Sequence, residues 1–239
     1  MSDSPRRFET THWSLIIRAG DAQAPDAAAA LATLCETYWY PVYAFVRRSG
    51  RSVEDAQDLT QAFFTKVLEK NYFKDARQDR GRFRSFLLAS VRHFLSNQRD
   101  FDRAGKRGGG QVPLSLEFDD GERTYQIDPA DDATPESVYE RRWALAVLDA
   151  GMRRVSMKYE AEPRRRLFEH LKPFLTGADP QSYADLSTQL DMTEGALRVA
   201  THRLRQQFAA SLREVIAETV ETPDEISDEL RHLMTVVSR

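Results

Sequence analysis

Cysteine, long apolar runs and recognisable catalytic motifs are scarce in this chain of 239 residues, and each scarcity excludes a class of protein. The single cysteine, Cys35, excludes an internal disulfide, and its apolar neighbours predict a core position rather than a nucleophilic site. No apolar run is long enough to span a bilayer, and the first residues lack the apolar stretch of a signal peptide. We therefore expect a cytoplasmic protein that does not enter a membrane.

Signatures of enzyme chemistry are also missing. The glycines at 108–110 lack the Lys-Ser/Thr pair that follows a phosphate-binding loop, and no nucleophile elbow is present. The histidines are scattered, and the pair Asp55 and Asp58 has no further metal ligand at helical spacing. We expect no enzyme activity, metal, cofactor or small-molecule substrate.

Helical periodicity is present along nearly every apolar segment, whereas strand-like alternation is scarce. Residues 31–46 predict one helix. The segment Ser52-Val-Glu-Asp55 has the form of a capping box, which predicts that a second helix begins there. The inner stripe expected for this second helix consists of Ala56, Leu59, Phe63 and Val67. The expected fold class is all-α.

Two helical domains joined by a flexible acidic linker are expected, because the periodic pattern fails after Gly105 and returns near Val138. Between them, a run of glycines and an acidic stretch with several prolines cannot support a core. The terminal extension is expected to pack on the second domain, and folding back over the basic second helix or binding a regulator are the alternatives. The expected parts are an N-terminal extension with a short helix (1–26), a first domain (27–107), the acidic linker (108–137), a second domain (138–215) and an acidic helical extension (216–239).

Charge is segregated along the chain, although the formal net charge is only -3. Residues 76–107 are rich in arginine, and acidic residues dominate 116–136. Residues 198–213 contain no acid, and residues 214–229 contain no Lys or Arg. Alternating blocks of this kind predict two nucleic-acid-facing surfaces separated by an acidic connector.

Residues 183–205 have the pattern of a helix-turn-helix whose second helix is basic. Apolar groups fall on one face of the first helix, and Thr193 is expected to cap the second. The expected buried stripe of the second helix is Ala196, Leu197, Ala200, Leu204 and Phe208. The candidate DNA-binding residues are Thr193, Glu194, Arg198, Thr201, His202, Arg203 and Arg205. An amphipathic helix pair with a solvated cationic face is the alternative from this segment alone.

Three stretches, in this order, resemble the extracytoplasmic-function sigma factors of the bacterial sigma-70 family. Residues 55–68 are similar to conserved region 2.2, residues 83–107 to regions 2.3 and 2.4, and residues 183–205 to region 4.2. The resemblance implies a subunit that binds core RNA polymerase, recognises the −35 and −10 promoter elements and helps to melt DNA at the −10 element. It makes residues 27–107 a sigma region 2 and residues 138–215 a sigma region 4.

The same resemblance assigns roles to individual residues. The helix at 55–68 would grip a coiled coil of the polymerase β′ subunit, with a solvated helix face as the alternative. Its contact residues are Asp55, Gln57, Asp58, Gln61 and Thr65. Contacts with the −10 element fall on Arg92, His93, Asn97, Gln98, Arg99, Arg103, Lys106 and Arg107, where cations would follow phosphates and amides would read bases. For the −35 element, the family positions are Arg198, His202 and Arg203, with Arg205 on a phosphate.

Region 2.2 departs from the family at Gln57, where a glutamate is usual, so the acidic face is weakened. The sequence also resembles the subset of these sigma factors associated with serine/threonine kinases. Phosphorylation of Ser52 or Thr65 would supply the missing charge, and simple capping or solvation by these hydroxyls is the alternative.

A stand-alone helix-turn-helix regulator is a second function class. It would explain residues 183–205, but it leaves residues 55–68 and the basic stretch before Gly108 unexplained. Association with core RNA polymerase separates the two classes.

Overall fold

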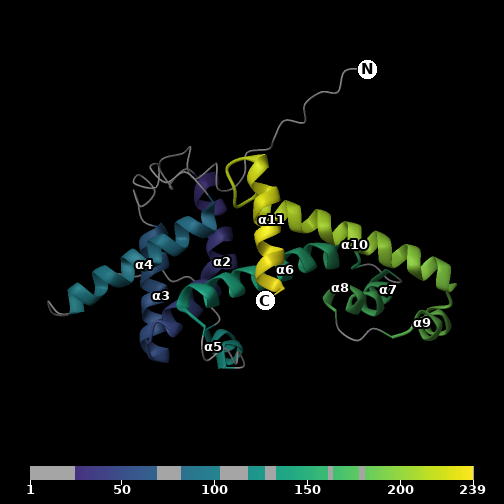
Figure 1. Cartoon of the computed structure of the whole chain (residues 1–239), viewed down its shortest axis with the longest axis horizontal. Coiled ribbons are helices and arrows are strands. Elements are labelled where there is room, and N and C mark those ends of the chain that lie inside the picture. Colours follow the sequence, from purple (N-terminus) through teal and green to yellow (C-terminus); the bar gives the residue numbers. More distant parts are fainter. Residues whose placement is uncertain are drawn as a thin grey trace, which may run out of the picture. The chain divides into compact units, whose positions relative to one another are not determined.

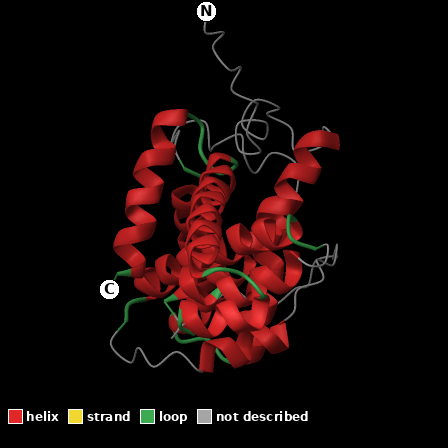
Figure 2. Cartoon of the chain, turned by 90° about the vertical axis from the view of Figure 1, so that its right-hand side faces the viewer, coloured by secondary structure: helices red, strands yellow, loops and turns green. Residues whose placement is uncertain are grey.

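The computed structural model describes residues 25–68, 82–102, 118–126, 133–160, 164–177 and 181–238. Over these ranges the chain forms helices joined by turns, without a strand (Figure 1; Figure 2). The all-α fold class expected from helical periodicity is confirmed. The chain divides into two compact units: Met1–Ala146 with Ile216–Arg239 form the first, and Val147–Val215 form the second.

In the first unit, α2 (Pro25–Arg48) packs against α3 (Val53–Leu68). The apolar row of α2 is buried and includes Cys35, as expected. Burial raises the pKa of the Cys35 thiol to about 12, so this thiol stays protonated and unreactive at neutral pH.

Helix α3 begins as the capping-box pattern predicts, because the backbone N–H of Asp55 donates to Oγ of Ser52 at 3.1 Å. Its buried stripe differs from the expected one: Leu59 is only half-buried, whereas Thr60 and Phe64, which were not expected, are buried. The observed spacing of three and four residues places the stripe one position further along the helix at this turn. The buried residues are Ala56, Thr60, Phe63, Phe64 and Val67.

A buried ion pair joins α4 (Phe83–Asp102) to α11 (Pro223–Val237) in the first unit. The guanidinium of Arg84 donates to both carboxylate oxygens of Glu229 at 3.1 Å. Burial disfavours the charged form of Arg84, but its hydrogen bonds to Glu229 and the nearby charges of Glu229 and Glu140 together outweigh this effect and raise the pKa of Arg84. The charge on both side chains is therefore compensated inside the unit.

Helix α6 (Pro135–Met157) joins the same network through its first half. Its Glu140 pairs with Arg84 and also lies 2.8 Å from Nε2 of His232 on α11. The indole of Trp143 lies 4.8 Å from the Arg84 guanidinium, and its N–H donates to the hydroxyl of Tyr38 at 3.0 Å. The terminal extension was expected to pack on the second domain, 138–215; its partner Glu140 lies in that range, whereas its partner Arg84 lies in the expected first domain, and both belong to the first unit.

The acidic connector contains a docked helix, α5 (Phe118–Gln126). Arg47 donates to both carboxylate oxygens of Glu122 at 3.0 Å, and the hydroxyl of Tyr43 donates to Glu122 at 2.6 Å. At Gly121 a Cβ atom would lie 2.8 Å from the ring of Trp39, so only glycine permits this close approach. The expectation of a flexible linker is wrong for these residues, since a buried acidic side chain anchors them to α2.

The second unit contains the end of α6, then α7 (Arg164–Leu171), α8 (Pro173–Thr176), α9 (Tyr183–Leu190) and most of α10 (Glu194–Ala217). A Cβ atom at Gly151 of α6 would lie 2.7 Å from Leu212, so these two helices also approach closely. The core of the unit consists of Val155, Phe168, Leu171, Leu186, Leu197 and Leu204.

Candidate nucleic-acid interface

Helices α9 and α10 are joined by a tight turn at residues 191–193. Asp191 adopts the left-handed conformation with φ 51°, which ends α9. Thr193 then caps α10, because its Oγ1 accepts a hydrogen bond from the N–H of Ala196 at 3.2 Å. The predicted helix-turn-helix segment therefore forms two helices with the expected break and the expected cap.

The buried stripe of α10 confirms part of the prediction and corrects it at two positions. Leu197 and Leu204 are buried as expected. Ala196 is exposed, although it was placed in the stripe, and Thr201 is buried at 1% exposure, although it was placed on the DNA-facing side. Position 201 follows 197 by four residues and precedes 204 by three, so helix geometry puts it on the buried face.

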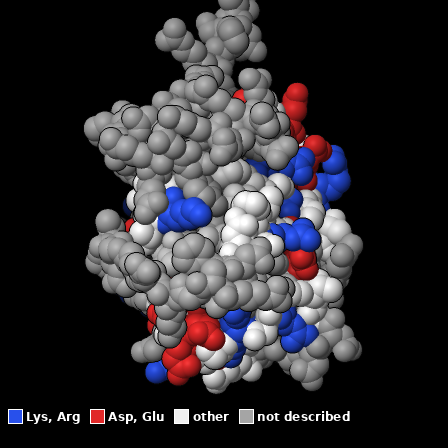
Figure 3. Space-filling model, turned by 90° about the vertical axis from the view of Figure 1, so that its left-hand side faces the viewer, with Lys and Arg blue, Asp and Glu red and all other residues white. Residues whose placement is uncertain are grey.

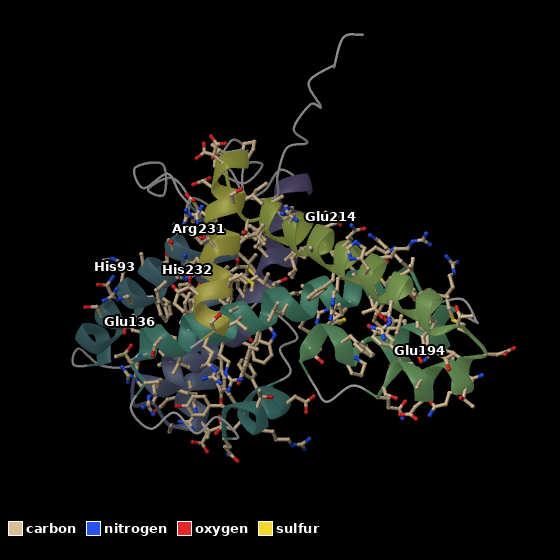
Figure 4. All side chains as sticks on the ribbon, turned by 45° about the vertical axis from the view of Figure 1, so that its right-hand side comes forward. His93, Glu136, Glu194, Glu214, Arg231 and His232 are labelled. Carbon is tan, nitrogen blue, oxygen red and sulfur yellow. The ribbon has the colours of Figure 1, made fainter. Side chains whose placement is uncertain are left out.

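The first basic residue of the exposed face, Arg198, is held in place by two neighbours. It lies 3.4 Å from the carboxylate of Glu194, which stands in the first turn of α10 (Figure 4), and 4.7 Å from the ring of Tyr183 on α9. A carboxylate in this turn is also favoured by the helix dipole. The guanidinium is thus positioned on the solvent side of the two helices, where a partner can reach it.

Three further candidates on α10 are exposed. Arg205 donates to the backbone oxygen of Phe174 at 3.4 Å, which ties it to α8. His202 lies 3.0 Å from the amide of Gln206, and Arg203 lies beside it on the same exposed side. The structure therefore brings together the arginines and the histidine that the sequence proposed, with Thr201 as the exception.

A basic cluster in α7 was missed at the sequence level. Arg164, Arg165 and Arg166 are all exposed, and Arg166 donates to the backbone oxygen of Gln189 at 2.7 Å. This bond places the cluster beside the last turn of α9. Cations in a first helical turn oppose the helix dipole, so arginines at this place do not stabilise the helix. The three consecutive arginines were therefore the sequence signal of a basic surface.

The candidate −10 residues on α4 are described only in part. Arg92 is exposed and lies 3.3 Å from Glu136 at the start of α6, while His93 lies 3.0 Å from Asn97 one turn away (Figure 4). The side chains of Gln98 and Arg99 lie outside the described residues. So do Arg103, Lys106 and Arg107.

The candidate polymerase face on α3 divides into two rows. Asp55 and Asp58 are exposed. The second row is half-buried and consists of Gln57, Gln61 and Thr65, and the hydroxyl of Thr65 donates to the backbone oxygen of Gln61 at 2.9 Å. Of the candidate phosphorylation sites, Ser52 is exposed at the helix cap, whereas Thr65 is partly covered.

The described surface carries charge of both signs. On the face drawn in Figure 3, the visible basic and acidic side chains are interspersed rather than gathered into one field. Among the described residues, no three His, Cys, Asp or Glu side chains are grouped as metal ligands. None of the helices described is both long enough and apolar enough to cross a membrane.

Comparison with known proteins gives no relative from which a function can be carried over. No protein-family model, curated protein or solved structure matches the chain.

Proposed function

We propose that the chain is a sigma factor that binds core RNA polymerase and directs it to promoters. In this proposal the segments 27–107 and 138–215 act as sigma regions 2 and 4, and the residues between them connect them. Region 4 recognises the −35 element, and region 2 recognises and melts the −10 element. The protein acts in the cytoplasm and catalyses no reaction of its own.

The observation that carries the proposal is the geometry of α9 and α10. A capped helix follows a tight turn, buries one stripe of its surface and exposes arginines and a histidine on the opposite side. A helix presented in this way fits the major groove, where an arginine can bind O6 and N7 of guanine. Discrimination from such a contact is about 1–3 kcal/mol.

The order of surfaces along the chain favours a sigma factor over a stand-alone regulator. A regulator needs the helix-turn-helix alone, whereas this chain also exposes Asp55 and Asp58 on α3 and basic residues on α4. A partly acidic helix suits a basic partner surface, because complementary potentials speed association and suppress wrong partners.

Association with core polymerase tests the proposal directly. The purified chain, mixed with core RNA polymerase, is expected to co-elute with it and to start transcripts at defined places on genomic fragments. The variant Asp58→Lys reverses charge on the proposed contact face and should weaken association. Its control, Glu36→Lys, makes the same charge change at an exposed position of α2. Binding of DNA operators without any association with polymerase would favour the stand-alone regulator.

Phosphorylation is the proposed control of this association, because Gln57 leaves the contact face short of one negative charge. A phosphate on Ser52 stands at the N-terminus of α3, where the helix dipole favours it. A phosphate on Thr65 stands beside Gln61 instead. Treatment with a serine/threonine kinase is expected to tighten polymerase binding, and Ser52→Ala and Thr65→Ala tell which hydroxyl is responsible. Equal binding by the unmodified and modified chains would contradict this control.

A further inference from the structure

Val199 lies on the side of α10 opposite its buried stripe. Two residues, or about 200° of helix rotation, separate it from Leu197 and from Thr201, both of which are buried. Its side chain is consequently 51% exposed. An apolar side chain thus stands on the outward side of the helix, among the candidate DNA-binding residues.

The fold of the second unit does not require valine at this position. Packing does not require valine, because half of the side chain faces solvent. Helix propensity does not require valine either, since a β-branched residue loses side-chain freedom in a helix and alanine would stabilise the helix more. Single exposed apolar residues are common on protein surfaces, so the neighbours of Val199 must indicate what it contacts.

Those neighbours are small residues on one side of Val199 along the helix and polar residues on the other. Gly195 and Ala196, four and three residues earlier on the same side, are exposed, and a Cβ atom at 195 would meet nothing within 4 Å. Small residues here leave room for a flat partner to reach the Val199 methyl groups. Three and four residues later, His202 and Arg203 are exposed on the same side and supply hydrogen-bond donors.

We propose that Val199 contacts the 5-methyl group of a thymine and so determines part of the sequence specificity, an inference that rests on the proposed DNA-binding function of α10. In the major groove the distinguishing apolar group on a base edge is the thymine methyl, and apolar side chains contact it. Valine places two methyl groups at the centre of the exposed face, with the donors of His202 and Arg203 directed to neighbouring base edges or phosphates. Val199 then selects thymine without making a hydrogen bond.

Removal of the base methyl alone tests this inference. The full chain bound to core RNA polymerase first selects its preferred sequence from duplexes with a randomised segment. Each thymine of the selected −35 element is then replaced singly by deoxyuridine, which lacks only the methyl group. One replacement is expected to weaken binding roughly fourfold, the effect of leaving one methyl group unburied. Val199→Ala should weaken binding to the thymine duplex by a similar factor and should be insensitive to that replacement.

Val237→Ala is the matched control, because Val237 of α11 is an exposed valine of comparable exposure, 48%. It should leave both the affinity and the deoxyuridine effect unchanged. The selected sequence could depend on Arg198 or Arg203 and yet be unaffected by every deoxyuridine replacement. That result would overturn the role of Val199 and leave the proposed function standing. A chain that selects no sequence, or never joins core polymerase, would overturn both.

Discussion

Glu229 carries its charge in an almost fully buried position, 1% exposed, where Arg84 and Arg82 neutralise it. Substitution of Glu229 by Gln keeps the shape but removes the charge, which leaves Arg84 buried with Glu140 as its remaining carboxylate partner. Loss of one partner of a buried pair costs about 3 kcal/mol, because the desolvated charge that remains is no longer compensated. Urea unfolding followed by circular dichroism should show a decrease of this size.

The adjacent residue provides the control. Asp228 also pairs with Arg82, at 3.2 Å, but its side chain is 52% exposed. Asp228→Asn should therefore change the free energy of unfolding by less than about 1 kcal/mol, as for other surface pairs. Equal losses in the two variants would mean that burial does not set the strength of the Glu229 pair.

Glu122 makes the docking of α5 dependent on pH. Burial raises its pKa, but hydrogen bonds from Arg47, Tyr43 and Gln126, together with the charge of Arg47, outweigh burial and hold the pKa below the usual 4.5. Because the folded-state pKa is the lower one, the stabilisation is complete above pH 4.5 and is lost as the pH falls through the folded-state value. Trp39 lies 5.5 Å from Phe118 of α5, so tryptophan fluorescence should report release of α5 in acid.

The variant Glu122→Gln cannot ionise at this position and should lack that component of the pH profile. If the fluorescence change of the wild-type chain in acid were retained in Glu122→Gln, another carboxylate would be responsible for it.

Among the helices, α5 and α10 allow the same substitution to be compared in two surroundings. Replacement of a glycine within a helix by alanine normally stabilises the protein, by up to about 1 kcal/mol. Gly195→Ala in α10 meets open space and should be stabilising. Gly121→Ala in α5 places a Cβ atom 2.8 Å from the ring of Trp39 and should instead cost about 1–3 kcal/mol through overpacking.

Thermal unfolding of both variants shows whether each substitution raises or lowers the stability. The Trp39 ring is held among Tyr40, Tyr43 and Phe118, which limits its ability to move aside. A stabilising Gly121→Ala would show that α5 does not approach α2 as closely as the structure has it.

Local patterns predicted the helices and caps of this chain, whereas long-range partners could not be predicted. Ser52 and Thr193 were identified as caps because the residues they bond are three positions away. The pair of Arg84 with Glu229 joins residues 145 positions apart, and no local signal marks either charge for burial. For the same reason the sequence pattern predicts a linker where α5 forms, since its anchor Glu122 has the pattern of one more solvated acid.

At the candidate site, the error at Thr201 has a different origin. Hydrophobicity alone separated the faces of α10, and threonine was counted as polar, although its position in the helix places it between Leu197 and Leu204. Val199 is assigned to neither face by the sequence pattern, although its position in the helix places it on the exposed side. Rotation about the helix axis predicts both residues correctly.

Helix α11 is expected to be a structural part of the first unit rather than a removable tail. Besides Glu229 it buries Leu233, and His232 reaches Glu140 of α6. Deletion of residues 221–239 keeps Thr219, whose backbone oxygen accepts from the N–H of Phe83 at 2.9 Å, but exposes Arg84. Without α11 the first unit should lose its near-ultraviolet circular dichroism and unfold at lower urea with a smaller slope, because less surface is buried. Met234→Lys, at a position 61% exposed on α11, should leave both measurements unchanged. A truncated chain with the same midpoint and slope as the full chain would make α11 an appendage, free to be displaced without loss of the core.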